Sequence, residues 1–149
     1  MSPEFTQRLA QARQEGDAQA ILDAIPYAQL IGIEPYEAGS ERVFRLPANK
    51  NNIGNPLLPA IHGGVIGGFM ETSAAAHLLL TMETVALPKI VDFSLDYLRA
   101  GRLTDTYASC QVWRQGRRVA NVAITAWQTS PDEPIATARA HFLLTPPSN

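Results

Sequence analysis

The segment Ala60–His77 reads AIHGGVIGGFMETSAAAH, and its composition decides the fold class. It is apolar apart from hydroxyl side chains, two histidines and a single acid, Glu71. Four glycines interrupt it, although each glycine costs about 1 kcal/mol relative to alanine inside a helix. An acid near the centre of a membrane span costs about 2.5–3.5 kcal/mol. The segment therefore predicts a buried helix of a globular domain, running from about Gly63 to Met82.

Glycine positions mark one face of this helix. Gly64, Gly67, Gly68, Glu71 and Ala75 follow helical spacing, so the face has almost no side chains before Glu71. Two interpretations are open. The glycines allow another element to pack closely on the helix backbone, or a ligand lies along this smooth face and reaches Glu71.

Glu71 has three interpretations. It is a core acid with a structural hydrogen-bond partner, an exposed helix residue, or a working carboxylate. Its apolar neighbours Phe69, Met70 and Ala74 disfavour the exposed position. Burial raises the pKa of a carboxyl group that has no partner, and a carboxylate of raised pKa suits a general base or a nucleophile.

His62, Gly63 and Gly64 lie where a loop enters the helix. A helix start presents free N–H groups and the positive end of the helix dipole. Backbone N–H donors at such a place stabilise a developing oxyanion, and glycine lets a carbonyl approach closely. An acid nine residues after the histidine strengthens the indication of a catalytic site.

The remaining segments predict a sheet around the helix. Residues 4–24 are predicted to be helical, with a break at Gly16-Asp17. Segment 47–61 is rich in proline and asparagine and is predicted to be an irregular loop, of a length that is often functional. Alternating and apolar runs predict strands over 29–37, 43–46, 91–97, 104–114, 118–129 and 135–145. Successive hairpins indicate an antiparallel sheet. We expect an α+β domain in which a curved sheet wraps one central helix, because a helix that is apolar nearly all round must be covered.

Composition excludes several classes of protein. The chain has 149 residues, 46% of them hydrophobic, which fits one domain with a real core. A net charge of −2 gives no reason to expect nucleic acid as the main partner. The single cysteine, Cys110, excludes an internal disulfide, and we expect it to be an inert thiol. The three histidines are scattered along the sequence, so we expect no metal site. The N-terminus shows no signal-peptide pattern, so we expect a cytoplasmic protein.

Two motifs resemble a known family. One is the helix start His62–Glu71 (HGGVIGGFME), which follows the asparagine-rich loop, and the other is the segment Asp92–Gly101 (DFSLDYLRAG). Together they resemble hotdog-fold acyl-CoA thioesterases, and the PaaI-like branch of phenylacetate degradation is the most similar. The resemblance covers about residues 30–145. It divides the chain into an N-terminal helical extension, 1–28, and a hotdog domain, 29–149.

The resemblance implies homodimers or dimers of dimers with active sites at the subunit interface, acting on acyl-CoA without a further cofactor. Glu71 would attack the thioester carbonyl or activate a water molecule, and the Gly63 N–H would bind the thioester oxygen. His62 would support the loop, and a loop asparagine would position the water or the acid. That asparagine lies six residues before the histidine in the family pattern, where this chain has Pro56, so Asn55 is the candidate.

Coenzyme A carries phosphates, which arginine binds well. Arg117 and Arg118, after a predicted hairpin turn, are the leading candidates, and Arg99 and Gly64 complete the expected coenzyme A-binding set. A water-binding Ser or Thr found in some relatives is replaced here by Ile90.

Two other functions stay open. One is an acyl-thioester hydratase or dehydratase, although His62 and Glu71 lie on roughly opposite sides of the helix. The other is a non-catalytic acyl-CoA-binding module, which the departures at Pro56 and Ile90 make credible.

Overall fold

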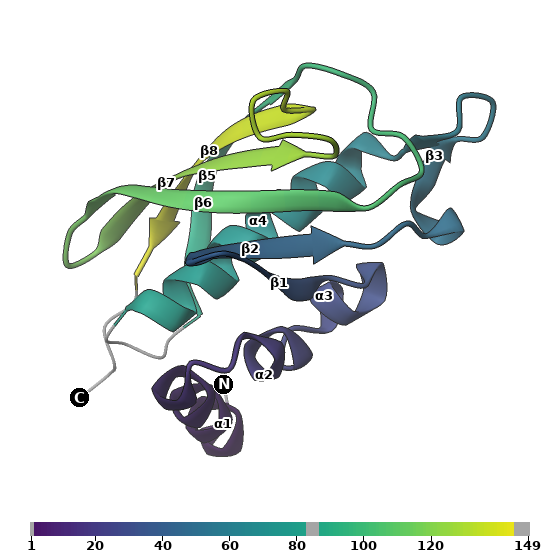
Figure 1. Cartoon of the computed structure of the whole chain (residues 1–149). Helices are drawn as coiled ribbons and strands as arrows, with labels where there is room; N and C mark the ends of the chain where they lie inside the picture. The colour runs from purple at the N-terminus through teal and green to yellow at the C-terminus, as the bar shows by residue number, and fades with distance from the viewer. Residues whose placement is uncertain (1, 83–86, 145–149) are drawn as a thin grey trace.

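The computed structural model describes residues 2–82 and 87–144, and in these ranges three short helices precede a sheet and one long helix (Figure 1). The helices are α1 (Pro3–Glu15), α2 (Ala18–Asp23), α3 (Pro26–Ile31) and α4 (Gly63–Thr81), with a 3-10 turn at Lys50–Asn52. The strands are β1 (Glu34–Ala38), β2 (Glu41–Leu46), β3 (Ile53–Asn55), β4 (Ala60–Ile61), β5 (Lys89–Tyr97), β6 (Thr106–Gln115), β7 (Val119–Trp127) and β8 (Ala136–Leu143).

Local capping sets the boundaries of the N-terminal helices. Gly16 ends α1 with a φ of 65°, and the Asp17 side chain then caps α2 by accepting a hydrogen bond from the Ala20 N–H. The break predicted at Gly16-Asp17 is confirmed. The strand predicted from residue 29 is wrong over its first part: residues 29–31 continue α3, Gly32 ends that helix with a φ of 88°, and β1 begins at Glu34.

Six strands form one antiparallel sheet in the order β1-β2-β6-β7-β8-β5. Burial alternates along β7 and β8, which shows that one face of each strand packs on the core. β5 is an edge strand of this sheet, so one side of its backbone has no strand partner within the described chain. β3 and β4 form a separate two-stranded hairpin inside the loop predicted over 47–61.

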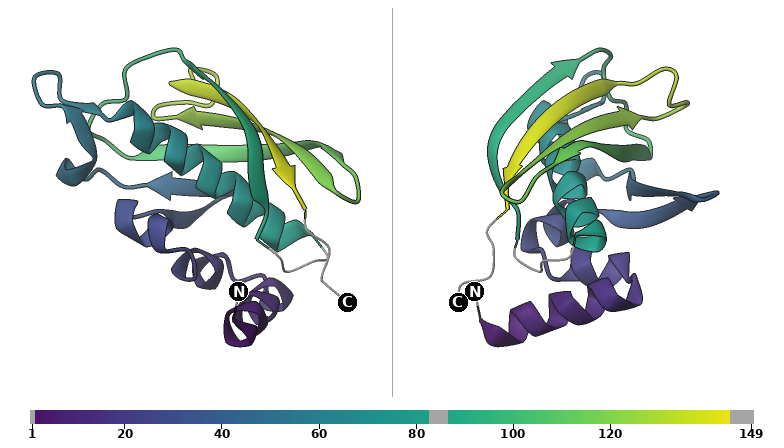
Figure 2. Two further views of the ribbon diagram at one scale, coloured as in Figure 1. Left: turned by 180° about the vertical axis from the view of Figure 1, so that it is seen from behind. Right: turned by 90° about the vertical axis from the view of Figure 1, so that its left-hand side faces the viewer.

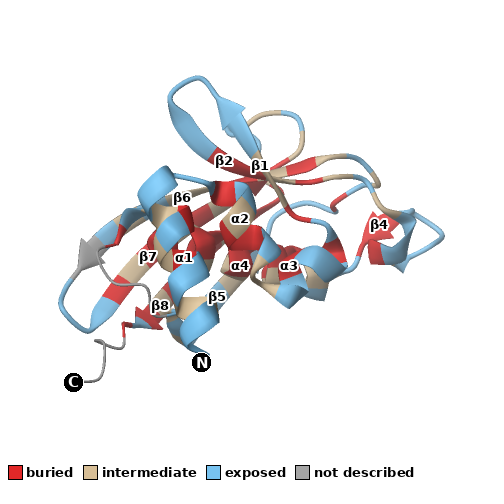
Figure 3. Cartoon of the chain, turned by 90° about the horizontal axis from the view of Figure 1, so that it is seen from below, coloured by how far each residue is buried: buried red, intermediate tan, exposed pale blue. Residues whose placement is uncertain are grey.

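Helix α4 crosses the concave side of the curved sheet (Figure 2), and α1, α2 and α3 pack against it from another side. Figure 3 shows buried residues along α4 and on the strands of the sheet. Phe44, Phe69 and Phe142, from β2, α4 and β8, are fully buried in this core. The predicted long helix and the α+β hotdog fold are confirmed.

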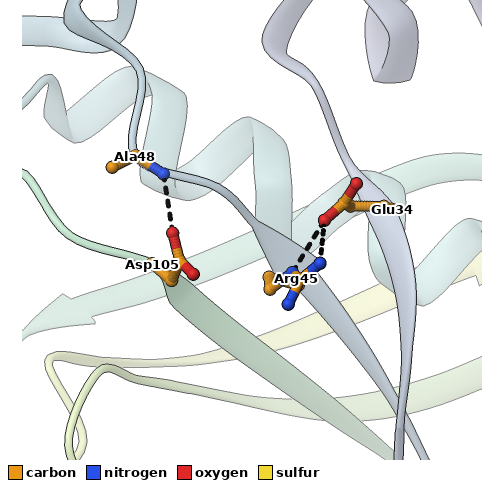
Figure 4. A network of polar contacts seen from close by, with 4 residues as sticks. All are labelled: Glu34, Arg45, Ala48 and Asp105. Atoms are coloured by element: carbon orange, nitrogen blue, oxygen red, sulfur yellow. Dashed lines mark hydrogen bonds and ion pairs between the residues drawn. The ribbon is translucent and has the colours of Figure 1, made fainter.

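Two polar contacts fix the strands near the entry to the loop (Figure 4). Arg45 of β2 forms an ion pair with Glu34 of β1, and the Ala48 N–H donates to Asp105 Oδ1 over 2.9 Å. The loop therefore leaves β2 from a position tied to the start of β6. Across residues 2–82 and 87–144, no helix combines the length and hydropathy that crossing a membrane requires.

Candidate active site

The first turn of α4 carries the candidate oxyanion donor. His62 caps the helix: its Nδ1 accepts a hydrogen bond from the Gly64 N–H over 2.9 Å, and its carbonyl accepts from Val65 and Ile66. Because Nδ1 accepts, the neutral imidazole carries its proton on Nε2. The described part of the chain provides no acceptor for the Gly63 N–H. Among the first amides of the helix, the Gly63 N–H is thus available to a ligand, whereas the Gly64 N–H is occupied.

The loop before α4 is anchored by Asn52, which sequence reasoning missed. Its backbone carbonyl accepts from the His62 N–H over 2.8 Å, and its side-chain amide donates to the Ile31 carbonyl over 3.0 Å. Asn52 is 6% exposed, so it joins the end of α3 to the start of α4 from inside the protein. Gly54 packs on the His62 backbone, since a Cβ on Gly54 would lie 2.7 Å from His62 Cα. The sequence shows only that this loop is rich in asparagine, and not which asparagine is buried.

Tyr97 completes the first turn and was also missed as a site residue. Its hydroxyl donates to the Gly63 carbonyl over 2.7 Å. A Cβ on Gly63 would lie 3.1 Å from the same hydroxyl, which is tighter than ordinary contact. Glycine at position 63 therefore allows the last residue of β5 to hold the helix start from the outside.

Glu71 lies two turns further along α4 and is partly buried. Desolvation by burial raises the pKa of its carboxyl group above the ordinary value for glutamate. Within the described residues no ion pair or hydrogen bond satisfies this carboxyl group. A carboxylate with these properties can accept a proton at a pH nearer neutrality than an exposed glutamate can.

The Gly63 amide and the Glu71 carboxylate of one chain do not face one another. They are eight residues apart, which corresponds to about 12 Å along the helix axis at about 1.5 Å per residue. His62 and Glu71 project from roughly opposite sides of α4. One carbonyl carbon cannot meet both the amide and the carboxylate of the same helix.

The glycine face is covered in part by the chain itself. A Cβ on Gly67 would lie 3.3 Å from Leu95 Cδ2, and a Cβ on Gly68 would lie 2.7 Å from Tyr27 Cε1. Gly67 thus packs against β5 and Gly68 against α3. Of the two interpretations of these glycines, close packing is the one that the structure shows.

Residues 58–135 match the model of the thioesterase superfamily, and the match spans more than half of the 149 residues. The chain belongs to the thioesterase superfamily. The matched region contains the whole of α4, and with it Gly63 and Glu71. The resemblance to hotdog thioesterases that the sequence motifs predicted is confirmed.

Several solved structures are similar to this chain. A protein of Chromobacterium violaceum is 47% identical with a TM-score of 0.76, over 95% of this chain and 99% of that one. A Ralstonia eutropha protein related to phenylacetic acid degradation is 20% identical with a TM-score of 0.70, over 80% and 90% of the two chains. A thioesterase of Haemophilus influenzae is 20% identical with a TM-score of 0.66, over 78% and 80%. The last two likenesses show the fold alone. No curated protein matches.

The loop asparagine expected from the superfamily pattern has a local partner in this chain. Asn55 Oδ1 accepts a hydrogen bond from the Leu57 N–H over 3.0 Å, and the Asn55 side chain is exposed at the β3–β4 turn. Its role in positioning water stays a prediction. Ile90 is partly buried in β5 opposite Phe142 and offers no polar group to a water molecule.

The candidate arginines lie at two ends of the sheet. Arg99 follows Tyr97 and is exposed at the end of β5 where Gly63 lies. Arg117 and Arg118 are exposed in the β6–β7 turn, at the opposite end of the sheet, where β5 begins. Of these three candidates, Arg99 alone lies at the Gly63 end within one chain.

Burial also shifts the pKa of two other side chains, His77 and Cys110. His77 is partly buried, its Nδ1 has no hydrogen-bond partner within the described residues, and its pKa is lowered by burial and by Arg42. Burial raises the pKa of the Cys110 thiol to about 12, as expected for an inert thiol. Within residues 2–82 and 87–144, no group of three or more His, Cys, Asp or Glu side chains is arranged to hold a metal ion.

Proposed function

We propose that the chain hydrolyses an acyl-CoA thioester to a free acid and coenzyme A. The observation that carries this proposal is the pairing, on one helix of a thioesterase-superfamily fold, of a free first-turn amide at Gly63 with a partly buried, unpartnered Glu71. The amide suits a developing oxyanion, and the carboxylate suits a base or a nucleophile.

The reaction divides between these two groups. The thioester oxygen lies at the start of α4, where the Gly63 N–H and the helix dipole stabilise the negative charge that develops on it. Glu71 either attacks the carbonyl carbon, giving a mixed anhydride that water then hydrolyses, or takes a proton from the attacking water. In both routes the carbon–sulfur bond breaks, and coenzyme A leaves as a thiolate and then takes up a proton.

The site requires a second copy of the chain, as a homodimer or a dimer of dimers. The amide of one chain and the carboxylate of the same chain are too far apart along α4 to act on one carbonyl. β5 supports the proposal, since it is an edge strand beside the helix start, and Tyr97 and Leu98 at its end are 55% and 54% exposed. Pairing of two such edges would place Glu71 of a second copy near Gly63.

Coenzyme A would then meet arginines from both copies. Arg99 lies at the Gly63 end and can contact the phosphates directly. Arg117 and Arg118 lie at the other end of the sheet, so they would reach the same coenzyme A only from a second copy. Gly64, exposed beside Gly63, leaves room for the pantetheine chain.

The test is release of thiol from a panel of acyl-CoAs. We expect Glu71→Gln to lower kcat by about a hundredfold or more, in the range of a positioned base or nucleophile. Glu37→Gln, an exposed acid on β1, is the matched control and should leave kcat unchanged. The partly buried Cys110 thiol, whose pKa burial raises to about 12, adds little background to a thiol reagent.

Three other results would redirect the proposal. Equal rates for wild type and Glu71→Gln would make Glu71 a structural acid. Accumulation of an enoyl product from a β-hydroxyacyl-CoA would identify a hydratase or dehydratase. Tight acyl-CoA binding in calorimetry without thiol release would identify a non-catalytic binding module.

A further inference from the structure

The outer face of the sheet, on the side away from α4, carries an open hollow. Phe93 and Leu95 of β5 lie against Gly67 of α4, so the residues that alternate with them point outward. Among the described helices, none lies over β5, β7 and β8 on this outer side in Figure 2. The hollow has a volume of about 640 Å³ and spans β6, β7, β8 and β5, which are neighbours in the sheet.

Trp113 of β6 stands at the rim of this hollow and is 67% exposed. The pairing of β6 with β7 shifts its register between Val112 and Arg114, so Trp113 is the extra residue of a β-bulge. Bulges re-aim side chains out of the regular pattern of a strand. Tryptophan is enriched at the centres of protein interfaces, where its large ring becomes buried. The exposed indole therefore marks this face as a contact surface.

Small side chains form the floor of the hollow, namely Ser94, Ala123, Thr125 and Thr137. Clefts of about 300–1,000 Å³ enclose drug-sized molecules, so a hollow of about 640 Å³ has room for an indole ring. Trp113 of the same chain leaves the hollow open, since its own ring stays exposed at the rim. A projecting ring and a hollow that can take such a ring thus lie on one patch.

Charges of both signs also lie on this patch. Asp92 pairs with His141, at 3.0 Å between Oδ2 and Nδ1. Asp96 and Arg139 line the hollow, are exposed, and form no ion pair within the described residues. A free carboxylate and a free guanidinium on one patch can each meet the opposite group of an identical patch.

We propose that a second copy of the chain docks on this face, with the Trp113 ring of each copy seated in the hollow of the other. A two-fold contact brings the same residues together from both sides, so one patch must contain both complementary features. The ring with the hollow, and Asp96 with Arg139, meet that requirement, whereas an unrelated partner would need only one of each. The face is separate from the unpaired edge of β5, so the two contacts together would join four chains.

Sedimentation velocity over a range of protein concentrations tests the contact without any substrate. We expect Trp113→Ala to halve the number of copies in the assembly, and to raise the dissociation constant of the affected step by about 30-fold or more, as for a central tryptophan of an interface. Leu30→Ala, 76% exposed on α3, is the matched control and should associate as the wild type does. A monomeric wild type, or equal association of wild type and Trp113→Ala, would overturn the inference.

A charge exchange tests the contact without removing the ring. Arg139→Asp should weaken association, because acids of both copies then meet, and Arg139→Asp combined with Asp96→Arg should restore it. Failure of the double variant to restore association would contradict this pairing. Trp127→Phe leaves Trp113 as the single tryptophan, and its emission should move to longer wavelength on dilution as the ring leaves the hollow. An emission that does not depend on concentration would show that the ring is not seated in a second copy.

Discussion

The contact between Gly68 and Tyr27 makes a prediction about stability that needs no substrate. Substituting Gly68→Ala places a methyl group where the Tyr27 ring now lies, because the new Cβ would sit 2.7 Å from Cε1. The same substitution in a Tyr27→Ala background meets no ring. We therefore expect the effect of Gly68→Ala to change sign between the two backgrounds.

The magnitude follows from two opposing terms. Alanine in place of glycine inside a helix stabilises by about 1 kcal/mol. Overpacking against the Tyr27 ring costs about 1–3 kcal/mol. Gly68→Ala should therefore leave the wild-type chain unchanged or destabilise it by up to about 2 kcal/mol, and should stabilise the Tyr27→Ala chain by about 1 kcal/mol. The coupling energy between the two sites is then about 1–3 kcal/mol.

Urea unfolding of the four proteins, at one protein concentration, measures this cycle. Gly67→Ala is the matched control, since its Cβ would meet Leu95 at 3.3 Å and not Tyr27. Its effect should be the same with and without the Tyr27 ring. If Gly68→Ala changes the free energy of unfolding equally in both backgrounds, within about 0.5 kcal/mol, the ring does not lie on the helix as described.

Three other substitutions test the remaining contacts. Burial raises the pKa of Glu71, so the folded chain binds a proton at this residue more tightly than the unfolded chain does. As the pH drops through that raised pKa, kcat/KM should therefore fall and the free energy of unfolding should rise. In urea titrations at several pH values, Glu71→Gln should make the free energy of unfolding depend less on pH. Tyr97→Phe removes the hydrogen bond to the Gly63 carbonyl and should lower kcat by about two- to tenfold; a raised KM with unchanged kcat would speak against a role in holding the helix start. Asn52→Ala should lower the free energy of unfolding by about 1–3 kcal/mol, as expected for a buried hydrogen bond, whereas the exposed neighbour Asn51→Ala should have little effect.

The elements with a strong pattern were predictable from the sequence. The helix predicted over Gly63–Met82 is observed over Gly63–Thr81, and alternation predicted β5 to within two residues. The short helix α3 was read as the start of a strand. Its six residues are too few to show a helical period, and an apolar run of that length fits either structure.

The site was predictable only where it is local in the sequence. His62 at the loop entry, the Gly63 amide at the helix start and the partly buried Glu71 all lie in one segment, and helix geometry relates them. Tyr27 and Tyr97 come from α3 and β5, and nothing in the sequence says which tyrosine meets which glycine. Only the packing of separate elements decides that.

The hydrogen bond from Tyr97 to Gly63 has a consequence for folding. The two residues are 34 positions apart in the chain, so the helix start acquires its final geometry only after β5 has docked. The helix itself forms by local contacts, which as a rule assemble faster than distant ones. During refolding, catalytic competence should therefore appear later than helical circular dichroism, and the delay between the two signals would time the docking of this edge strand.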